Sequence, residues 1–302
     1  MGARHSKNRP ISISRAPRAA LAPWVARLYA TWIDVPADLP IACGLLADTA
    51  SLRVFLTADA IAVTRDGAVP CPRGAMFFGP QTRRMPITVR GRFAAVGVGF
   101  RPGASHALRE VGIEPLMDRV VPIEHFGGDG QALLSRFEGR DDPAAWIDML
   151  EIYIEQVFSG WRDVPPDCIT TAFDRAAFAN PNRRIADVAD ELGCTRRRLE
   201  RIVRRDFGMS PKQVLRRARA LDMAATLRGV ADAGEADQLA LRYYDQSHLT
   251  RDFVSFFEMT PAQFMQTPQP IMTNTLEIRQ ARRLEELDRL QPGERYPWRS
   301  GR

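Results

Sequence analysis

The sequence has few of the residues that build metal centres, disulfide frameworks or membrane spans. It contains four cysteines without a C-x-x-C pair and four isolated histidines. We therefore expect unpaired thiols in a reducing compartment, no metal and no cofactor. There is no run of eighteen apolar residues, and the arginine-rich residues 1–18 lack an apolar stretch, so neither a membrane span nor a secretory signal is predicted.

What the sequence does contain is typical of a folded, two-part protein. With 302 residues, 45% hydrophobic and 26% charged, the chain is long enough for two domains. A helix over about 143–161 with an apolar stripe is expected to pack on a sheet or on a second subunit. Short strand-like segments separated by Gly and Pro turns predict a small antiparallel sheet or barrel, at residues 52–57, 60–64, 75–78, 87–90 and 93–100.

Positive charge is concentrated in one segment. Residues 181–228 carry thirteen basic and six acidic side chains, a larger excess than the net charge of +6 of the whole chain. Nearly all of these basic residues are arginines, whose planar fork suits phosphates and guanine edges. Charge alone would also fit a solvated basic face. The placement of the arginines on helices therefore has to decide between a solvated face and a DNA-binding face.

That placement follows a helix-turn-helix pattern. Apolar residues recur at helical spacing over 185–192, Gly193 is suited to end that helix, and Thr195 is a good N-cap for the next. The second helix would bury Leu199 and neighbouring apolar residues. In a helix-turn-helix this second helix enters the major groove. Its predicted outward stripe consists of Arg196, Arg197, Glu200, Arg201 and Arg204.

These residues, with others further along, resemble the AraC/XylS family of transcription regulators. The resemblance is carried by Ile185–Thr195, Arg198–Arg201, Gly208–Pro211, Arg219–Ala224, Tyr243–Phe253 and Thr260–Phe264. It implies a tandem, homeodomain-like helix-turn-helix domain, in which a connecting helix holds two recognition helices in successive major grooves. By position, base-facing residues would be Arg197, Glu200, Arg201, Gln246, Ser247, Thr250 and Arg251, with Arg196 and Arg204 nearer to phosphates.

The second unit departs from the family pattern at two points. The usual Gly before the aromatic pair Tyr243-Tyr244 is missing, and 239–244 is about two residues short. Glu258 stands where the final turn usually has Gly. A residue other than Gly in the left-handed region costs about 1–2 kcal/mol, so this turn is either strained or built differently.

Three N-terminal motifs resemble the β-rich domain of one branch of AraC-type regulators: Phe78–Thr82, Val98–Ala104 and Leu116–Val121. The role of that domain is not established, so the resemblance implies a regulatory or dimerising part. Arg101–Gly103 is most simply a turn from strand to helix. An anion at that helix N-terminus is the alternative.

We therefore expect an α+β protein, a small antiparallel β domain with helices followed by an all-α DNA-binding domain. It would be a cytoplasmic, nucleoid-associated regulator without enzymatic activity. Double-stranded DNA is the expected partner, and RNA polymerase, a small-molecule effector and a second copy are further candidates. The predicted division is a disordered basic tail at 1–18, a regulatory or dimerisation domain at 19–163, the DNA-binding domain at 170–267 and a polar, partly helical tail at 268–302.

Two alternatives belong to other classes. One is a protein-interaction module whose second helix-turn-helix is degenerate. The other is a DNA-linked enzyme, either a cupin-like oxygenase or a methyl acceptor. A cupin site needs clustered metal ligands, and a methyl-accepting cysteine needs neighbours that stabilise a thiolate; the sequence displays neither pattern.

Overall fold

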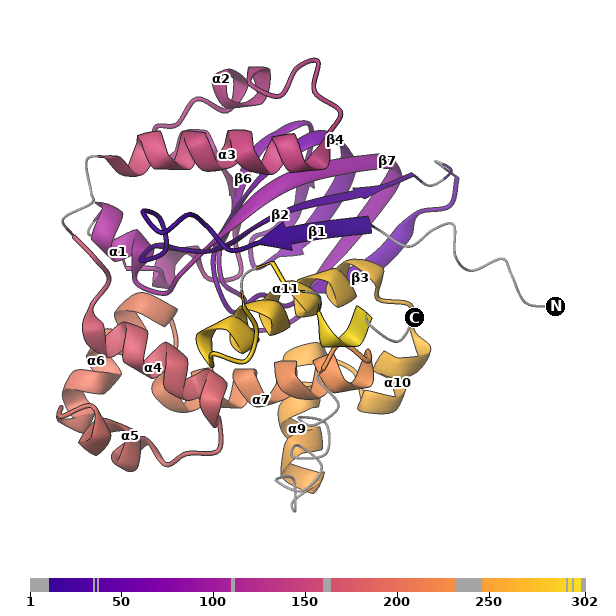
Figure 1. Ribbon diagram of the computed structural model, residues 1–302. Coiled ribbons are helices and arrows are strands. Elements are labelled where there is room, and N and C mark those ends of the chain that lie inside the picture. Colours follow the sequence, from indigo (N-terminus) through magenta and orange to yellow (C-terminus); the bar gives the residue numbers. More distant parts are fainter. Residues whose placement is uncertain are drawn as a thin grey trace.

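The structure, a computed structural model, describes residues 11–34, 36, 38–109, 112–159, 164–231, 246–291, 293, 294 and 296–299. An antiparallel sheet forms the upper half of the molecule in Figure 1, and a cluster of helices forms the lower half. The α+β class predicted from the sequence is confirmed.

The sheet has eight strands in the order β1-β2-β7-β4-β6-β8, with β3 paired to β7 and β5 to β4. All strand pairs are antiparallel. The strands are β1 (Ile11–Arg15), β2 (Val25–Ile33), β3 (Ile41–Leu45), β4 (Ser51–Thr64), β5 (Gly67–Cys71), β6 (Gly74–Phe78), β7 (Met85–Phe100) and β8 (Val120–Pro122).

Two long strands, β4 and β7, hold the sheet together. Four predicted segments are the halves of these strands: the sequence shows a break where the strand only bends. In β4 the register shifts on either side of Thr57, and in β7 Gly91 takes φ 62°. Each bend re-aims the strand, so that one half pairs with different neighbours from the other half.

Apart from β8, which lies between α1 and α2 in the chain, the strands precede the helices. Their bounds are α1 (Ala104–Arg109), α2 (Gly130–Ser135), α3 (Pro143–Phe158), α4 (Cys168–Ala179), α5 (Ile185–Glu191), α6 (Arg196–Phe207), α7 (Pro211–Leu227), α9 (Gln246–Phe257), α10 (Pro261–Gln266) and α11 (Pro270–Glu286). Short 3-10 helices occupy Glu114–Leu116, Ile123–Phe126 and Pro297–Arg299. None of the helices described is long and apolar enough to cross a bilayer.

One face of the sheet is covered by α3. Its residues Leu150 and Ile154 pack with Leu28 of β2 and Val96 of β7 in one buried cluster. Of the two arrangements predicted for this helix, packing on the sheet or on a second subunit, packing on the sheet is the one observed. The apolar side chains of α3 are not all covered, because Val157 is 45% exposed.

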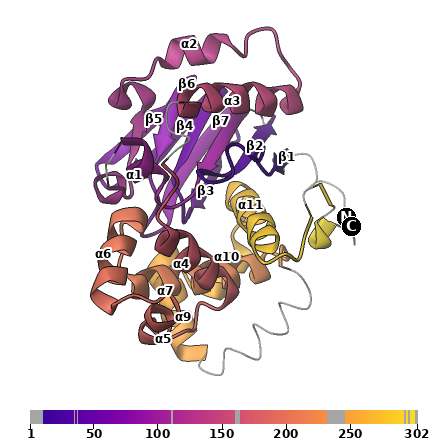
Figure 2. The same cartoon turned by 60° about the vertical axis from the view of Figure 1, so that its left-hand side comes forward.

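The opposite face of the sheet is covered by α11, which lies between the sheet and the lower helices (Figure 2). A polar tail was predicted here, and the polar composition is real, yet most of the helix is buried. Its charged side chains are paired across the interface: Arg279 bonds Asp48 and Asp222, and Glu285 pairs with Arg27. The polar composition of this segment therefore did not mean that it lies on the surface.

The N-terminal tail was also expected to be disordered up to residue 18. Instead, β1 pairs with β2, and the carboxylate of Glu151 on α3 anchors the following segment. It accepts hydrogen bonds from Arg15 Nη2 and from the Arg18 backbone N–H, both at 2.7 Å. The buried Glu151 supplies the negative charge that orders this basic segment, and the segment's own sequence contains no such charge.

Candidate nucleic-acid interface

The first helix-turn-helix has the local geometry that its sequence predicts. Helix α5 ends before Gly193, which takes φ 61°, and α6 then begins after Thr195. The Thr195 Oγ1 accepts a hydrogen bond from the Arg198 N–H at 3.2 Å, as an N-cap should. Leu199 and Val203 are fully buried, which fixes the rotation of α6 about its axis.

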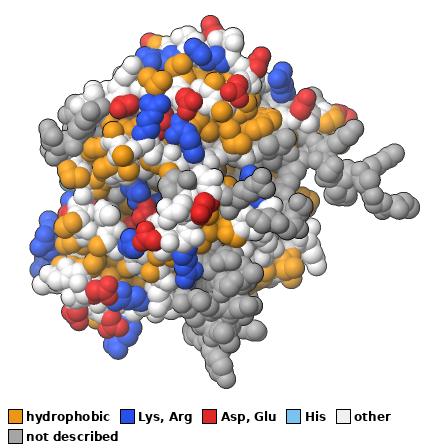
Figure 3. All heavy atoms as spheres, in the orientation of Figure 1, with side chains coloured by type: hydrophobic (Ala, Val, Ile, Leu, Met, Phe, Trp, Pro, Cys, Tyr) orange, Lys and Arg blue, Asp and Glu red, His pale blue; other side chains and the backbone are white. Residues whose placement is uncertain are grey.

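The outward stripe of α6 is exposed. Basic side chains gather at the left edge of Figure 3, where α6 lies. Arg196 bonds Glu200 at 3.0 Å, an exposed pair of neighbouring helical turns. Arg197, Arg201 and Arg204 are exposed and form no ion pair with the described part of the chain. Three guanidinium groups on one helix face are therefore available to an anionic partner.

The basic side chains of residues 181–228 were counted together, but not all of them face outward. Arg217 is fully buried and donates to the backbone carbonyls of Gln81 and Asp48 at 2.8 and 3.0 Å. Arg216 and Arg219 both bind the Asp252 carboxylate, at 2.6 and 2.8 Å. Part of the arginine excess thus holds the domain together.

In the second unit, α9 is the helix predicted to recognise DNA. Its predicted core side chains, Leu249, Phe253, Phe256 and Phe257, are all buried. Thr250 and Arg251 lie on its exposed side. Gln246 and Ser247 lie in its first turn, but their side chains fall outside the described residues, as does the shortened segment 239–244.

Both recognition helices end in the same way. After α6, Gly208 takes φ 68° and Ser210 forms a capping box with Gln213. After α9, Glu258 takes φ 56° and Thr260 forms a capping box with Gln263. The turn after α9 is therefore the strained one of the two alternatives: Glu258 occupies the left-handed region that Gly occupies in the first unit.

Helix α7 fixes the spacing of the two recognition helices, because it packs against both α6 and α9 (Figure 1). The Asp252 carboxylate on α9 pairs with two of the arginines of α7, Arg216 and Arg219, and is itself buried. These ion pairs attach α9 to the connecting helix α7. The connecting helix predicted at 219–224 is thus part of a longer one.

Two loops of the sheet domain touch the ends of the recognition helices. The Arg84 N–H donates to the carbonyl of Phe256 at 2.6 Å, and the Ile113 N–H donates to the carbonyl of Arg205 at 3.0 Å. Thr82 joins the two loops, because its N–H donates to Asp118 Oδ1 at 2.7 Å. No role was predicted for these contacts, although Thr82 and Asp118, which join the two loops, belong to the motifs at 78–82 and 116–121.

A buried ion network lies where the sheet, α7 and α11 meet. Arg279 Nη1 donates to Asp222 Oδ1 at 2.6 Å, and its Nε donates to Asp48 Oδ2 at 2.8 Å. Burial favours the neutral form of Asp48, but Arg279 and Arg217 together hold the pKa of this carboxyl below its usual value. In the described part of the chain, His, Cys, Asp and Glu form no cluster that could hold a metal ion.

Comparisons with known proteins agree with this geometry. One family model, a helix-turn-helix domain, matches residues 188–267, and another, described as a domain of unknown function, matches 14–122. A search of curated proteins found no match.

Several solved structures are similar to the chain. Apo ToxT from Vibrio cholerae is 12% identical, with 79% of this chain and 97% of ToxT covered and a TM-score of 0.46. ToxT bound to an unsaturated fatty acid is 11% identical, with 87% and 97% covered and a TM-score of 0.45. The AraC-like transcriptional activator CuxR is 12% identical, with 85% and 100% covered and a TM-score of 0.30.

The helix-turn-helix match and the exposed α6 define the class: the chain is a DNA-binding transcription regulator. Its DNA-binding part is the helix-turn-helix domain that matches residues 188–267.

Proposed function

We propose that the chain recognises a specific duplex site by placing α6 and α9 in successive major grooves. The observation that carries this proposal is the exposed arginine stripe of α6, whose rotation is fixed by its buried side. Arg197 and Arg201 would donate to base edges, and Glu200 would accept from a cytosine amino group once DNA draws Arg196 to a phosphate. Arg204 would contact the backbone.

In the second groove we assign base contacts to Gln246, Ser247, Thr250 and Arg251. The support is the matching pair of helix ends, because the same left-handed turn and capping box follow α9 as follow α6. Since α7 holds both helices, a single docking would bring both units to the duplex. A protein with this role works at the chromosome, in the cytoplasm.

We further propose that the sheet domain controls DNA binding. The loops at 79–84 and 112–119 contact the ends of α9 and α6, respectively, so a change in the sheet domain reaches both recognition helices. An effector that binds one arrangement of these contacts more tightly than the other would shift the protein toward that arrangement. The resulting change in the affinity for DNA is limited by the difference between the effector's affinities for the two arrangements.

The test begins with selection of duplexes from a random pool by the full chain, followed by affinity measurements on the selected site. Arg201→Ala should weaken binding by about 1–3 kcal/mol, roughly 5- to 150-fold, and relax preference at one base pair. Arg204→Ala should weaken binding to all sequences and reduce the salt dependence by about one unit of slope.

Arg136→Ala is the matched control, because Arg136 bonds Gln156 beside α3, on the far side of the sheet. It should bind DNA as the wild type does. A wild-type affinity for Arg201→Ala would show that the assigned face of α6 is wrong. If no sequence were enriched at all, the interaction-module alternative would replace specific DNA recognition.

A further inference from the structure

Val254 is an apolar residue on the exposed side of α9. The other large apolar side chains in the described parts of α6 and α9 are buried, whereas Val254 is 38% exposed. With 3.6 residues per turn, Val254 lies between Thr250 and Arg251 around the helix, about 40° from the first and about 60° from the second. Both neighbours are exposed and are among the proposed base contacts of α9. Val254 therefore lies on the face of α9 that would meet DNA.

The backbone shows which residue of the first unit corresponds to Val254. The Glu258 N–H donates to the Val254 carbonyl at 2.9 Å, and the Gly208 N–H donates to the Arg204 carbonyl at 3.0 Å. Glu258 and Gly208 are the left-handed residues that follow α9 and α6. The two units therefore place a valine and an arginine at equivalent positions.

This difference changes what the last turn of the helix can contact. The guanidinium of Arg204 can reach a phosphate at the edge of the groove, a contact that strengthens binding to every sequence. Valine has neither charge nor hydrogen-bond donor, and its methyl groups are attached directly to Cβ. Its side chain therefore stays near the base edges. There, the 5-methyl group of thymine is the apolar feature of the major groove.

Thr250 places another methyl group beside Val254. Residues four apart on a helix have Cβ atoms about 5–6 Å apart, so the two side chains are neighbours. Both are exposed and both are branched at Cβ. Because valine has one strongly preferred χ1 rotamer in a helix, little side-chain freedom is lost when a methyl group packs against it. Val254 and Thr250 together form a small, stiff apolar surface that one methyl group can cover.

We propose that Val254 reads a thymine in the second major groove through contact with its 5-methyl group, which also contacts Thr250 Cγ2. This inference rests on the proposed function and names the base required at one position of the second half-site. Cytosine, the other pyrimidine, has no methyl group at this place. The second unit thus discriminates between bases where the first unit, through Arg204, gains affinity without discrimination.

The experiment replaces each thymine of the duplex selected from the random pool, one at a time, by deoxyuridine, which lacks only the 5-methyl group. The affinity of the full chain for each duplex is measured at one salt concentration, because salt changes the affinity of all of them. The half-site of the second unit is the one in which Arg201→Ala does not relax base preference.

One thymine of this second half-site should be sensitive to the replacement. Deoxyuridine there should weaken binding about fourfold, which corresponds to about 0.8 kcal/mol for one buried methyl group. 5-Bromodeoxyuridine at the same position should restore binding, because bromine fills the space of the methyl group.

Val254→Ala removes the side chain that contacts the thymine. The fourfold difference between thymine and deoxyuridine should then fall below about twofold, because contacting groups do not contribute independently. Alanine is also a better helix former than valine, so α9 should remain folded. Val254→Arg should instead bind every duplex more tightly, raise the salt dependence by about one unit of slope, and lose the preference for thymine.

Val157→Ala is the matched control, since Val157 is a valine of α3 that is 45% exposed; it should keep the full difference between thymine and deoxyuridine. A second half-site without thymine, or one whose thymines all tolerate deoxyuridine, would overturn the assignment. The same holds if Val254→Ala keeps the wild-type difference, because the methyl group would then contact another residue.

Selection of a duplex separates this inference from the proposed function. If a duplex is selected and its affinity does not depend on any thymine methyl group, only the role of Val254 fails. If no duplex is selected, the proposed DNA recognition fails and this inference fails with it.

Discussion

Replacing Arg279 by methionine should strongly destabilise the protein. Arg279 is 6% exposed and is shared by the carboxylates of Asp48 and Asp222, which belong to the sheet domain and α7. Burial disfavours the guanidinium charge, but the two acids raise the pKa of Arg279 above its usual value, so the group stays charged. Methionine fills a similar volume without charge, and it leaves the buried Asp222 and the partly buried Asp48 without their shared partner.

The expected loss is about 3–5 kcal/mol in the free energy of unfolding, the range for breaking a buried ion pair from one side. With 302 residues and an unfolding entropy of about 2.1 cal/mol/K per residue, 1 kcal/mol corresponds to roughly 1.6 °C in a cooperative transition. Arg279→Met should therefore lower the melting temperature by about 5–8 °C in calorimetry.

Two variants control for other causes. Arg175→Met breaks the exposed 2.8 Å pair with Asp288 and should cost less than about 1 kcal/mol. Adding Asp222→Asn to Arg279→Met should recover part of the loss, because an amide needs no counter-ion. The reasoning is refuted if Arg279→Met melts within about 2 °C of Arg175→Met.

The remaining predictions concern backbone strain and acid. Gly193→Ala should cost about 1–2 kcal/mol in urea unfolding, because Gly193 has φ 61° and a Cβ there meets no atom; an unchanged midpoint would contradict this. Glu258→Gly should instead gain about 0.5–1 kcal/mol, relief of strain less the entropy of Gly; a loss would point to its pair with Arg83. Asp48 has a lowered pKa, so its stabilisation is present above about pH 3.9 and is lost as pH falls through the folded value. Between pH 5 and pH 3 the wild type should therefore lose more stability than Asp48→Asn, and equal losses would contradict the network.

The first helix-turn-helix could be predicted residue by residue because its signals are local. Helical spacing, the left-handed Gly193 and the Thr195 cap each act within one or two turns of chain. The strained Glu258 was visible for the same reason, as an exception to a local turn rule. Which arginines face outward also followed, since burial of Leu199 leaves one side of α6 exposed.

Strand β2 and the burial of helix α11 were not recognised, and for opposite reasons. Strand β2 is buried on both faces, so its residues do not alternate between polar and apolar. Helix α11 is polar, and its charges are compensated by acids and bases far away in the chain, such as Asp48 and Arg27. Neither the burial of β2 on both faces nor the distant charge partners of α11 can be inferred from a few neighbouring residues.

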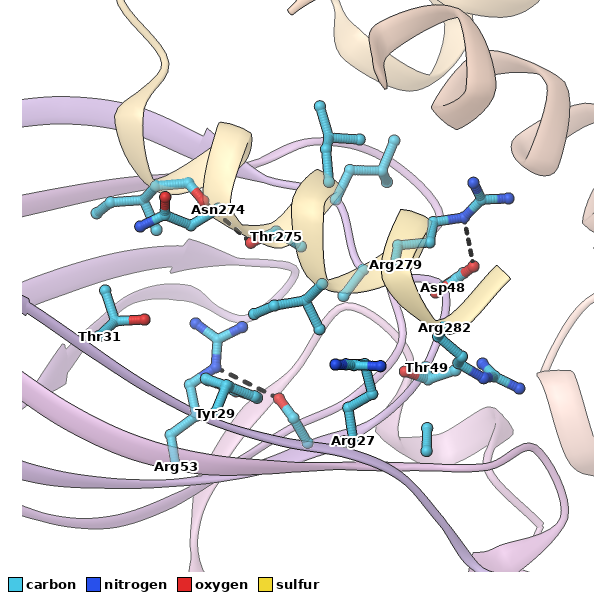
Figure 4. A pocket seen from close by; sticks show the side chains of 18 of the residues that line it. Arg27, Tyr29, Thr31, Asp48, Thr49, Arg53, Asn274, Thr275, Arg279 and Arg282 are labelled. Carbon is cyan, nitrogen blue, oxygen red and sulfur yellow. Dashed lines mark hydrogen bonds and ion pairs between the residues drawn. The ribbon is translucent and has the colours of Figure 1, made fainter. Parts of the chain in front are cut away.

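The sequence by itself determined the class of protein, the α+β order of its parts and the face of α6 that is available to DNA, because helix caps, turns and apolar spacing are set by near neighbours. Only the tertiary structure decided that Arg217 is buried and that Arg216 and Arg219 pair with Asp252, and that α11 roofs a cavity with Arg53 on its floor (Figure 4). The reason is electrostatic: an arginine can lie inside or outside, depending on whether distant residues bring it a carboxylate or a carbonyl oxygen.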